Sequence, residues 1–263
     1  MGPMASPDPS APTRAGSEDA DLQRQFWNAW NAKFREEGLQ LPPPNTRQAQ
    51  TVLGWLQDTN RGLRDIVEVG CGSGWLCGLM TEFGRVQGID LADEALARSR
   101  ARFPEATFTA GDFMQMELPP ASADVVVALE VLSHVSDQPA FISRVAQLLR
   151  GDGVLMLATQ NRFVLERTAG VTPKAPGQVR QWVDAAELRR LLEPQFEILQ
   201  LTSLHPTGHL GVLRWVNSGR LESLLSSIGL ANAWTSLREK RLLGHTLMVH
   251  ARKRVSQFGG KVP

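Results

Sequence analysis

The sequence contains few cysteines: Cys71 and Cys77 are the only two among its 263 residues. Two cysteines six positions apart provide neither a disulfide framework nor the paired spacing of a zinc site, which fits a reducing compartment. We therefore expect both thiols to serve packing rather than chemistry.

An excess of charge of one sign is also missing, because 28 Lys and Arg residues face 27 Asp and Glu residues, a formal net charge of +1. Such a chain lacks the strong positive field with which proteins hold nucleic acids or anionic membranes. No apolar run approaches the roughly 20 residues of a membrane span. We expect a cytoplasmic protein with no nucleic-acid partner and no membrane insertion, and the oligomeric state is left open.

The first 20 residues are rich in proline, serine, alanine and acidic residues and contain no apolar stretch. They cannot bury enough surface to offset the cost of ordering, so residues 1–20 are predicted to be a disordered tail. The remainder, 21–263, has the size of a single domain with elaborations. Its expected parts are a helical lid over 21–60, a core over 61–160, cap segments over 161–245, and a final strand with a tail over 246–263.

Short apolar runs alternate with helical patterns between residues 65 and 159. The runs end at Val69, Asp90, Thr109, Leu129 and Thr159. The segments between them place apolar residues three to four positions apart, as amphipathic helices do. Strand–helix units of roughly 20–30 residues predict an α/β fold with a parallel sheet and right-handed crossovers.

The flanks of this alternating region differ from it. An amphipathic helix is predicted over 21–34, and a long irregular stretch over 160–183. The segments 196–201 and 246–251 are typical of a closing pair of strands. The insertion of roughly 40 residues between them, with a helix predicted over 221–228, is long enough to be functional.

A glycine-rich loop is the most informative segment. Residues 68–75 (EVGCGSGW) follow a predicted strand and open a predicted helix. Glycines there allow a tight turn and the close approach of a ligand to the backbone. A dinucleotide site, as in a dehydrogenase, would need a third glycine of its G-x-G-x-x-G pattern at position 75, where this chain has Trp75. The bulky indole argues against a pyrophosphate on this helix terminus, which leaves a dehydrogenase as a distant alternative.

Glu68 with the three glycines resembles the first motif of the class I S-adenosylmethionine-dependent methyltransferases. Further landmarks follow in the order of that family: Asp90, the segments 111–113 and 130–134, and the segment 149–153. The segment 130–134 (EVLSH) is similar to the small-molecule branch that includes the ubiquinone and menaquinone biosynthesis enzymes. The resemblance covers about a third of the chain, 65–159. It implies a Rossmann-like, doubly wound, seven-stranded sheet with a helical N-terminal lid and an insertion before the last strand.

The same resemblance implies S-adenosylmethionine as cofactor. Asp90 is expected to accept hydrogen bonds from both ribose hydroxyls and Asp112 from the adenine amino group, while Leu91 or Phe113 covers the adenine ring. Acids after strands are also common as helix caps and turn residues, which is the competing interpretation for both carboxylates.

The methionyl half of the cofactor is expected at the glycine loop. Gly70, Gly72 and Gly74 would leave room for it. Glu68 would orient the loop or a water molecule on the ammonium group, and the main-chain carbonyl of Leu129 would accept from that ammonium. Trp30 on the N-terminal helix either covers the cofactor or belongs to the core.

Methyl transfer requires the alignment of donor and acceptor and the exclusion of water. A general base is needed only when the acceptor arrives protonated, as a phenol or an alcohol does. The candidate bases are His134, His205 and His209. His134 could instead be a hydrogen-bonded histidine at a helix start, and the segment 205–209 could be only a turn.

Two differences from known methyltransferase motifs narrow the class of methyl acceptor. Some quinone-type relatives place a divalent metal on Glu-x-x-Glu-His, whereas this chain has Glu130, Ser133 and His134, so we expect no metal. The Asn/Asp-Pro-Pro-Tyr/Phe motif of nucleic-acid base methylation is absent after the fourth predicted strand. The expected function is O-methylation of a small molecule, such as a phenol, quinone precursor or specialised metabolite. The alternatives are N-methylation of a small amine or amino sugar and, in another class, a non-catalytic scaffold.

Overall fold

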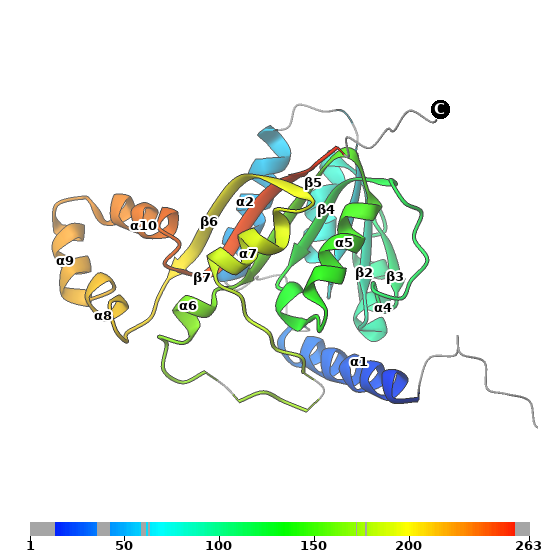
Figure 1. Cartoon of the computed structure of the whole chain (residues 1–263), viewed down its shortest axis with the longest axis horizontal. Helices are drawn as coiled ribbons and strands as arrows, with labels where there is room; N and C mark the ends of the chain where they lie inside the picture. Colours follow the sequence, from blue (N-terminus) through cyan, green and yellow to red (C-terminus); the bar gives the residue numbers. More distant parts are fainter. Residues whose placement is uncertain are drawn as a thin grey trace, which may run out of the picture.

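The computed structural model describes residues 14–35, 43–58, 62, 64–171, 173–176 and 178–255. Within these residues, seven strands form one sheet in the order β3-β2-β1-β4-β5-β7-β6 (Figure 1). The strands are β1 (Arg64–Val69), β2 (Gly84–Asp90), β3 (Thr107–Ala110), β4 (Ala123–Leu129), β5 (Leu149–Gln160), β6 (Phe196–Pro206) and β7 (Gly244–Lys253). The first five are parallel, and β7 runs antiparallel to both of its neighbours. The predicted α/β class and the doubly wound, seven-stranded sheet are confirmed.

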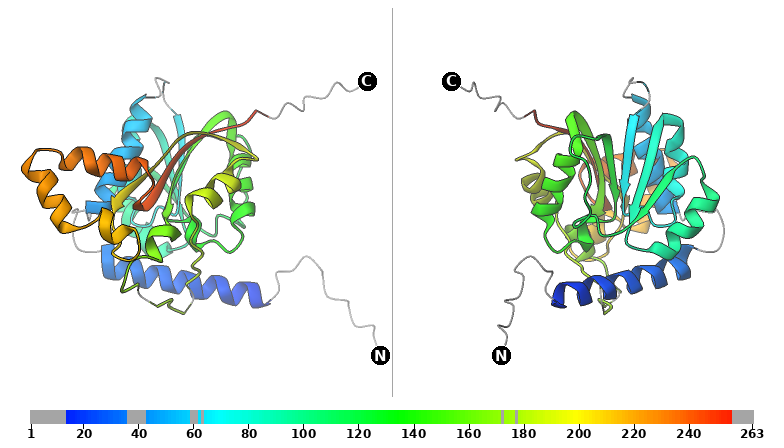
Figure 2. Two further views of the ribbon diagram at one scale, coloured as in Figure 1. Left: turned by 60° about the vertical axis from the view of Figure 1, so that its left-hand side comes forward. Right: turned by 90° about the vertical axis from the view of Figure 1, so that its right-hand side faces the viewer.

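Helices cover both faces of the sheet (Figure 2). The helices α2 (Pro43–Asp58), α3 (Trp75–Met80) and α4 (Asp93–Arg102) pack on one face, and α5 (Gln138–Leu148) and α7 (Ala185–Leu192) pack on the other. Two short 3-10 helices, η1 (Thr81–Phe83) and η2 (Leu132–His134), follow α3 and β4.

Strand β4 shows why the sheet is buried on both sides. Its alternate residues Val126 and Ala128 face the α5 and α7 layer, whereas Val125 and Val127 face the α2 and α3 layer. All four are almost fully buried. A strand covered by helices on both faces has an unbroken apolar sequence, and each buried valine contributes roughly 1.5–3 kcal/mol.

The topology fixes where a ligand can enter. The chain winds outward from β1 through β2 to β3, and in the other direction from β4 to β5. The connections after β1 and β4 therefore diverge at the carboxyl ends of two neighbouring strands. Open α/β sheets bind ligands in the crevice at such a switch point.

The helix α1 (Arg14–Arg35) crosses the carboxyl edge of the sheet, as the predicted lid would (Figures 1 and 2). The Nδ2 atom of Asn28 donates to Oδ1 of Asp93, which links α1 to α4 at 2.9 Å. The prediction of a disordered tail over 1–20 is wrong for residues 14–20, because they form the first turns of α1. These residues follow the last proline of the tail and include good helix formers, and extending an existing helix costs little. Residues 1–13 lie outside the described part.

Beyond β5 the chain adds the helices α6 (Arg162–Leu165), α8 (Leu213–Val216), α9 (Gly219–Ser227) and α10 (Ala231–Lys240). The last three form the predicted insertion and project past β6 at the edge of the sheet, where α10 packs on that strand (Figure 1). Among the described residues, no helix is both long enough and apolar enough to cross a bilayer.

The predicted closing pair of strands is confirmed; the pair is antiparallel, and both strands extend beyond the predicted segments 196–201 and 246–251. Strand β5 starts at Leu149, directly after α5 ends at Leu148, so the landmark segment 149–153 forms the start of this strand. Leu149 pairs with Ala123 of β4, and regular pairing with β4 and β7 begins at Val154.

Candidate active site

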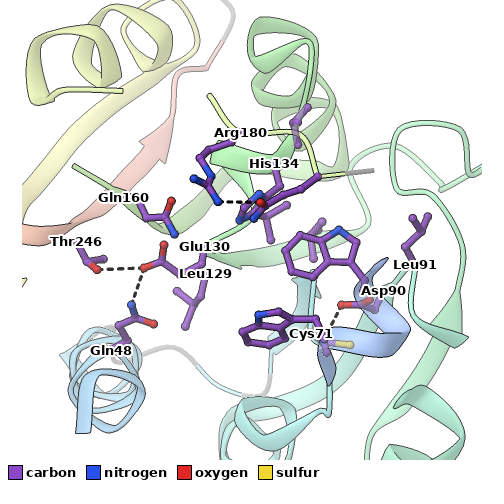
Figure 3. Close-up of a pocket in the computed structure, with 18 of the residues that line it drawn as sticks. Gln48, Cys71, Asp90, Leu91, Leu129, Glu130, His134, Gln160, Arg180 and Thr246 are labelled. Atoms are coloured by element: carbon purple, nitrogen blue, oxygen red, sulfur yellow. Dashed lines mark hydrogen bonds between the residues drawn. The ribbon is translucent and has the colours of Figure 1, made fainter. Parts of the chain in front are cut away.

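A cavity of about 910 Å³ opens at the carboxyl edge of the sheet. Its walls come from the loops after β1, β2, β3 and β4, from α1 and α2, from the segment 165–182, and from the facing ends of β6 and β7. Figure 3 shows that it has two ends, one at Asp90 and Leu91 and the other at Glu130, Gln48 and Thr246.

The glycine loop forms part of the cavity wall. Gly70 and Gly72 line it with φ values of 72° and 52°, in the left-handed region that favours glycine. A Cβ atom at Gly70 would collide with the side chain of Val131. Gly74 is not part of the wall. A Cβ atom there would come within 2.6 Å of the Phe108 ring, so this glycine serves the packing of α3 on the sheet.

Asp90, the last residue of β2, ties the glycine loop in place. Its Oδ2 accepts from the backbone N–H of Gly72 at 2.7 Å and its Oδ1 from that of Ala92 at 2.8 Å. Burial raises the pKa of this carboxyl above its usual value. Both oxygens keep a lone pair for a further donor. The backbone bonds correspond to the competing interpretation of a turn acid, yet Asp90 and Leu91 also line the cavity.

Asp112 and Phe113 also line the cavity, and their loop lies beside Asp90, whose backbone carbonyl accepts from the N–H of Gly111 at 2.9 Å. The Oδ1 atom of Asp112 accepts from the backbone N–H of Met114 at 2.9 Å. Phe113 is largely buried, with its ring 5.5 Å from that of Phe141 in an edge-to-face contact. The structure therefore brings two carboxylates and an apolar surface together in the wall of one cavity.

Glu68 lies beneath the glycine loop on β1, and Leu129 lines the cavity at the end of β4. The Cys77 thiol donates to Oε2 of Glu68 at 2.9 Å. Burial raises the pKa of the Glu68 carboxyl to about 8. Both cysteines are free and lie within the apolar core on the α2 and α3 side, in line with the packing role that we expected.

Aromatic residues of α1 cover the cavity. Trp27 and Trp30 both line it, with ring centroids 5.9 Å apart. Asn31 is buried, donates to the carbonyl of Trp27 at 3.0 Å and faces Gly72. The helix thus lies directly over the glycine loop.

His134 ends η2 and lines the cavity. Its Nδ1 lies 2.8 Å from the carbonyl oxygen of Val179, which can only accept, so Nδ1 carries the proton and Nε2 keeps its lone pair. Burial lowers the pKa of this imidazole, with Arg180 acting in the same direction. The ring also contacts Trp27 edge-to-face at 4.8 Å. A neutral imidazole with an unprotonated Nε2 can accept a proton.

The other two candidate histidines differ in their position relative to the cavity. His205, with φ of 58°, lines the cavity beside His245 of the neighbouring strand. His209 does not line the cavity, and its Nε2 accepts from the backbone N–H of Ala169 at 3.0 Å. The structure therefore does not bring His209 together with the other candidates, because this bond holds its ring in the loop after β6.

A polar cluster at the second end of the cavity was not expected as a site. The Oε1 atom of Glu130 accepts from Nε2 of Gln48 at 2.7 Å and from Oγ1 of Thr246 at 3.1 Å, while its Oε2 is buried without a partner (Figure 3). Burial raises the pKa of this carboxyl. The sequence showed Glu130 only as part of the segment 130–134 and of an incomplete metal-binding pattern. Gln48 and Thr246 come from α2 and β7, so no local pattern could have indicated them.

The segment before α7 completes the wall with Gln178, Arg180 and Trp182. Nη2 of Arg180 donates to Oε1 of Gln178 at 2.8 Å, and its guanidinium lies 5.4 Å from the Trp182 ring. None of the residues in α8, α9 and α10 lines the cavity. The expectation that the cap segments extend over all of 161–245 is corrected for these three helices, since they lie outward beside β6.

No cluster of three potential metal-ligating side chains occurs in the described part of the chain. Ser133 is buried where the quinone-type pattern has its second glutamate. The expectation that the protein uses no metal stays a prediction.

Comparison with known proteins identifies the family to which this chain is similar. Residues 67–157 match a family described as a methyltransferase domain. A probable S-adenosylmethionine-dependent methyltransferase of Mycolicibacterium smegmatis is 38% identical over 131 residues, which cover 49% of this chain and 50% of that protein. A ubiquinone biosynthesis O-methyltransferase of Actinobacillus pleuropneumoniae is 30% identical over 167 residues, which cover 52% of this chain and 71% of that protein. The chain thus spans about half the length of the first of these relatives.

Among solved structures, the N-methyltransferase NodS of Bradyrhizobium japonicum, in complex with S-adenosylhomocysteine, superposes with a TM-score of 0.62. It shares 15% identity over 89% of this chain and 99% of that one. At this identity the likeness concerns the fold alone. The sheet order and the glycine loop beside an acid at the end of β2 define the class I methyltransferase architecture. The chain belongs to the class I S-adenosylmethionine-dependent methyltransferases, a family of enzymes whose cofactor is S-adenosylmethionine. The resemblance and the cofactor that it implied are confirmed, and the dehydrogenase alternative is set aside.

Proposed function

We propose that this protein transfers a methyl group from S-adenosylmethionine to the hydroxyl oxygen of a small molecule, such as a phenol, a quinone precursor or a specialised metabolite. The supporting observation is one cavity that joins an acidic, glycine-walled end to a second polar end (Figure 3). The cofactor supplies a methyl group already activated by its sulfonium. A protein with such a donor has to bind the cofactor and the acceptor, align them and exclude water.

The nucleoside half of the cofactor fits the end at Asp90. The free lone pairs of this carboxylate would accept from the ribose hydroxyls, and Asp112 would accept from the adenine amino group. Leu91 and Phe113 offer the apolar surface for the adenine ring. The hydroxyl and amino groups of a nucleoside would give both carboxylates at this edge of the sheet a hydrogen-bond donor.

The methionyl half fits the glycine loop. At Gly70 and Gly72 the wall consists of backbone without a side chain. A larger residue is disfavoured at both positions, because its Cβ atom would collide with Val131 at the first and come within 3.1 Å of Asn31 at the second. Leu129 exposes its end of β4 to the cavity, where its carbonyl would accept from the ammonium group. Trp30 would cover the bound cofactor from α1.

His134 is proposed as the general base for the acceptor hydroxyl. Its tautomer places the lone pair on Nε2, and its lowered pKa keeps the ring neutral near pH 7. His205 lines the cavity as a further contact for the acceptor. His209 has no part in this proposal, because its ring is engaged outside the cavity.

N-methylation of a small amine is the second candidate, and one observation favours it. The unpartnered Oε2 of Glu130 offers a negative group at the acceptor end, where an amine would find an acceptor for its protons.

The test is the release of S-adenosylhomocysteine with a panel of phenols, hydroxyquinones, hydroxy acids and amines. We expect turnover with at least one hydroxyl acceptor. We also expect His134→Gln to lower kcat by roughly 10²–10⁴-fold, the usual contribution of a general base, with an unchanged affinity for S-adenosylhomocysteine.

In the same assay, the wild-type rate should rise with pH through the lowered pKa of His134 and then level off. Undiminished turnover of His134→Gln at every pH would contradict its role as base. Failure of the wild-type protein to bind S-adenosylhomocysteine would contradict the proposed function itself.

A further inference from the structure

The second end of the cavity contains a carboxylate that the proposed reaction does not use. Glu130 follows β4 with φ of 61°, a backbone conformation that is costly for a side chain larger than glycine. This conformation turns the carboxylate toward Gln48 of α2 and Thr246 of β7. Strained residues of this kind cluster at ligand sites.

Two oxygen atoms in this cluster lack partners. Gln48 donates its Nε2–H to Oε1 of Glu130, so the amide orientation is fixed and its Oε1 points elsewhere. That Oε1 and the Oε2 of Glu130 are both buried with no hydrogen bond. The orphaned atoms are thus two acceptors, one of which belongs to a carboxylate.

The charge of this cluster is also uncompensated. In the part of the chain that the structure describes, none of the ion pairs includes Glu130. Arg180, which also lines the cavity, is bonded to Gln178 and lies on the His134 side (Figure 3). A buried carboxylate without a cation is costly, and its natural complement is a positive group that several acceptors can surround.

We infer that Glu130 and Gln48 form a binding site for a protonated amine carried by the methyl acceptor. The ammonium group would donate to Oε2 of Glu130 and to Oε1 of Gln48. This inference rests on the proposed function, since it assigns a substrate class to the acceptor end of the same cavity. It narrows that class to small molecules with a primary or secondary amine.

The burial of Glu130 raises its carboxyl pKa in the absence of a ligand. A bound ammonium would favour the ionised carboxylate, so the site and the ligand stabilise each other's charge. A neutral hydroxyl at the same place could satisfy one acceptor but could not compensate the charge. The site therefore discriminates between an amine and an alcohol of equal size.

The experiment is calorimetric binding to the full chain saturated with S-adenosylhomocysteine. The probes are two matched pairs, tyramine with tyrosol and phenethylamine with phenethyl alcohol, which differ only in an amino group against a hydroxyl. We expect the amines to bind at least about tenfold more tightly than the alcohols, as for a hydrogen bond to a charged group. Glu130→Gln, which keeps the shape and removes the charge, should abolish this preference. The control Glu117→Gln, which changes an exposed carboxylate outside the cavity, should retain it.

A preference below about twofold in the wild-type protein, or one that survives in Glu130→Gln, would overturn the inference. So would a loss of affinity for S-adenosylhomocysteine in Glu130→Gln with the amine preference intact, because the carboxylate would then serve the cofactor. Amine binding that depends on added Mg²⁺ and disappears with a chelator would overturn it in favour of a cation site. The affinity of the wild-type protein for S-adenosylhomocysteine is measured first, so failure of the proposed function is recognised separately.

Discussion

At the scale of single residues, Asp90 shows how one side chain can serve both the backbone and a ligand. Asp90 uses one lone pair of each oxygen for the backbone of the glycine loop and of the α4 start, and offers the others to the cavity. It therefore organises the loop and presents a carboxylate to the ligand at the same time. The interpretations of this acid as a turn residue and as a ligand group are compatible in the structure.

Asp90→Asn should weaken the binding of S-adenosylhomocysteine by roughly 10- to 100-fold, the range for hydrogen bonds to a charged group. An asparagine provides a single acceptor oxygen, so it cannot serve both backbone N–H groups and two hydroxyls. Isothermal titration calorimetry measures this affinity. Asp58→Asn, at the exposed end of α2, is the matched control and should bind as the wild-type protein does. An unchanged affinity in Asp90→Asn would remove this residue from the cofactor site.

The roles of single residues were only partly accessible from the sequence. Glu68 and Asp90 lie near the carboxyl ends of their strands and Asp112 follows the next strand, so their common edge could be predicted from the alternation of strands and helices. The contact of His134 with Val179 joins positions 45 residues apart, and the Glu130 cluster spans three elements. Such juxtapositions depend on tertiary packing, for which a single sequence carries no periodic signal.

At the scale of elements, the wall of the cavity depends on how the connection after β5 is fixed to the sheet. Asn161 is buried, and its Nδ2 donates to the carbonyls of Leu242 and Gly244, each at 2.9 Å. Its backbone also pairs with Val183, at the other end of the segment that carries Arg180. One side chain thus joins the start of α6 to the start of β7.

Asn161→Ala should lower the free energy of unfolding by roughly 2–4 kcal/mol, because a buried carbonyl at Gly244 and a partly buried one at Leu242 lose their donor. Urea denaturation followed by circular dichroism measures the change. Asn232→Ala, at an exposed position in α10, should alter stability by less than about 0.5 kcal/mol. A loss in Asn161→Ala no larger than in this control would show that the junction is held by other contacts.

The elements themselves were predicted better than their ends. Apolar periodicity identified the strands and α5, because buried faces repeat every two or about four residues. It failed at residues 14–20, where composition favoured disorder over helix. Local composition does not decide the structure of these residues, because the continuation of α1 overrides it.

At the scale of the whole molecule, the buried acids around the cavity couple stability to pH. The carboxyls of Glu68, Asp90 and Glu130 all have pKa values raised by burial. The native state therefore holds protons that the unfolded state releases once the pH exceeds the usual carboxyl pKa. Raising the pH then favours unfolding, so this contribution to stability is complete at low pH and is lost as the pH rises through the native pKa values.

For Glu68, the window lies between its usual pKa of 4.5 and its native value of about 8. We expect the Tm of the ligand-free protein to fall between pH 5 and pH 8, and to fall less in Glu68→Gln, which cannot ionise. Differential scanning calorimetry across this range measures both slopes. Equal slopes would mean that the native state does not retain the proton of Glu68 in this window.

The most direct test of the whole account is a crystal structure of the protein with S-adenosylhomocysteine. We predict the ribose hydroxyls on the Asp90 carboxylate, the adenine between Leu91 and Phe113, and the methionyl chain along Gly70 and Gly72, with the Glu130 end left open for the acceptor. A ligand whose nucleoside lies at the Glu130 end, or outside the cavity, would contradict the account.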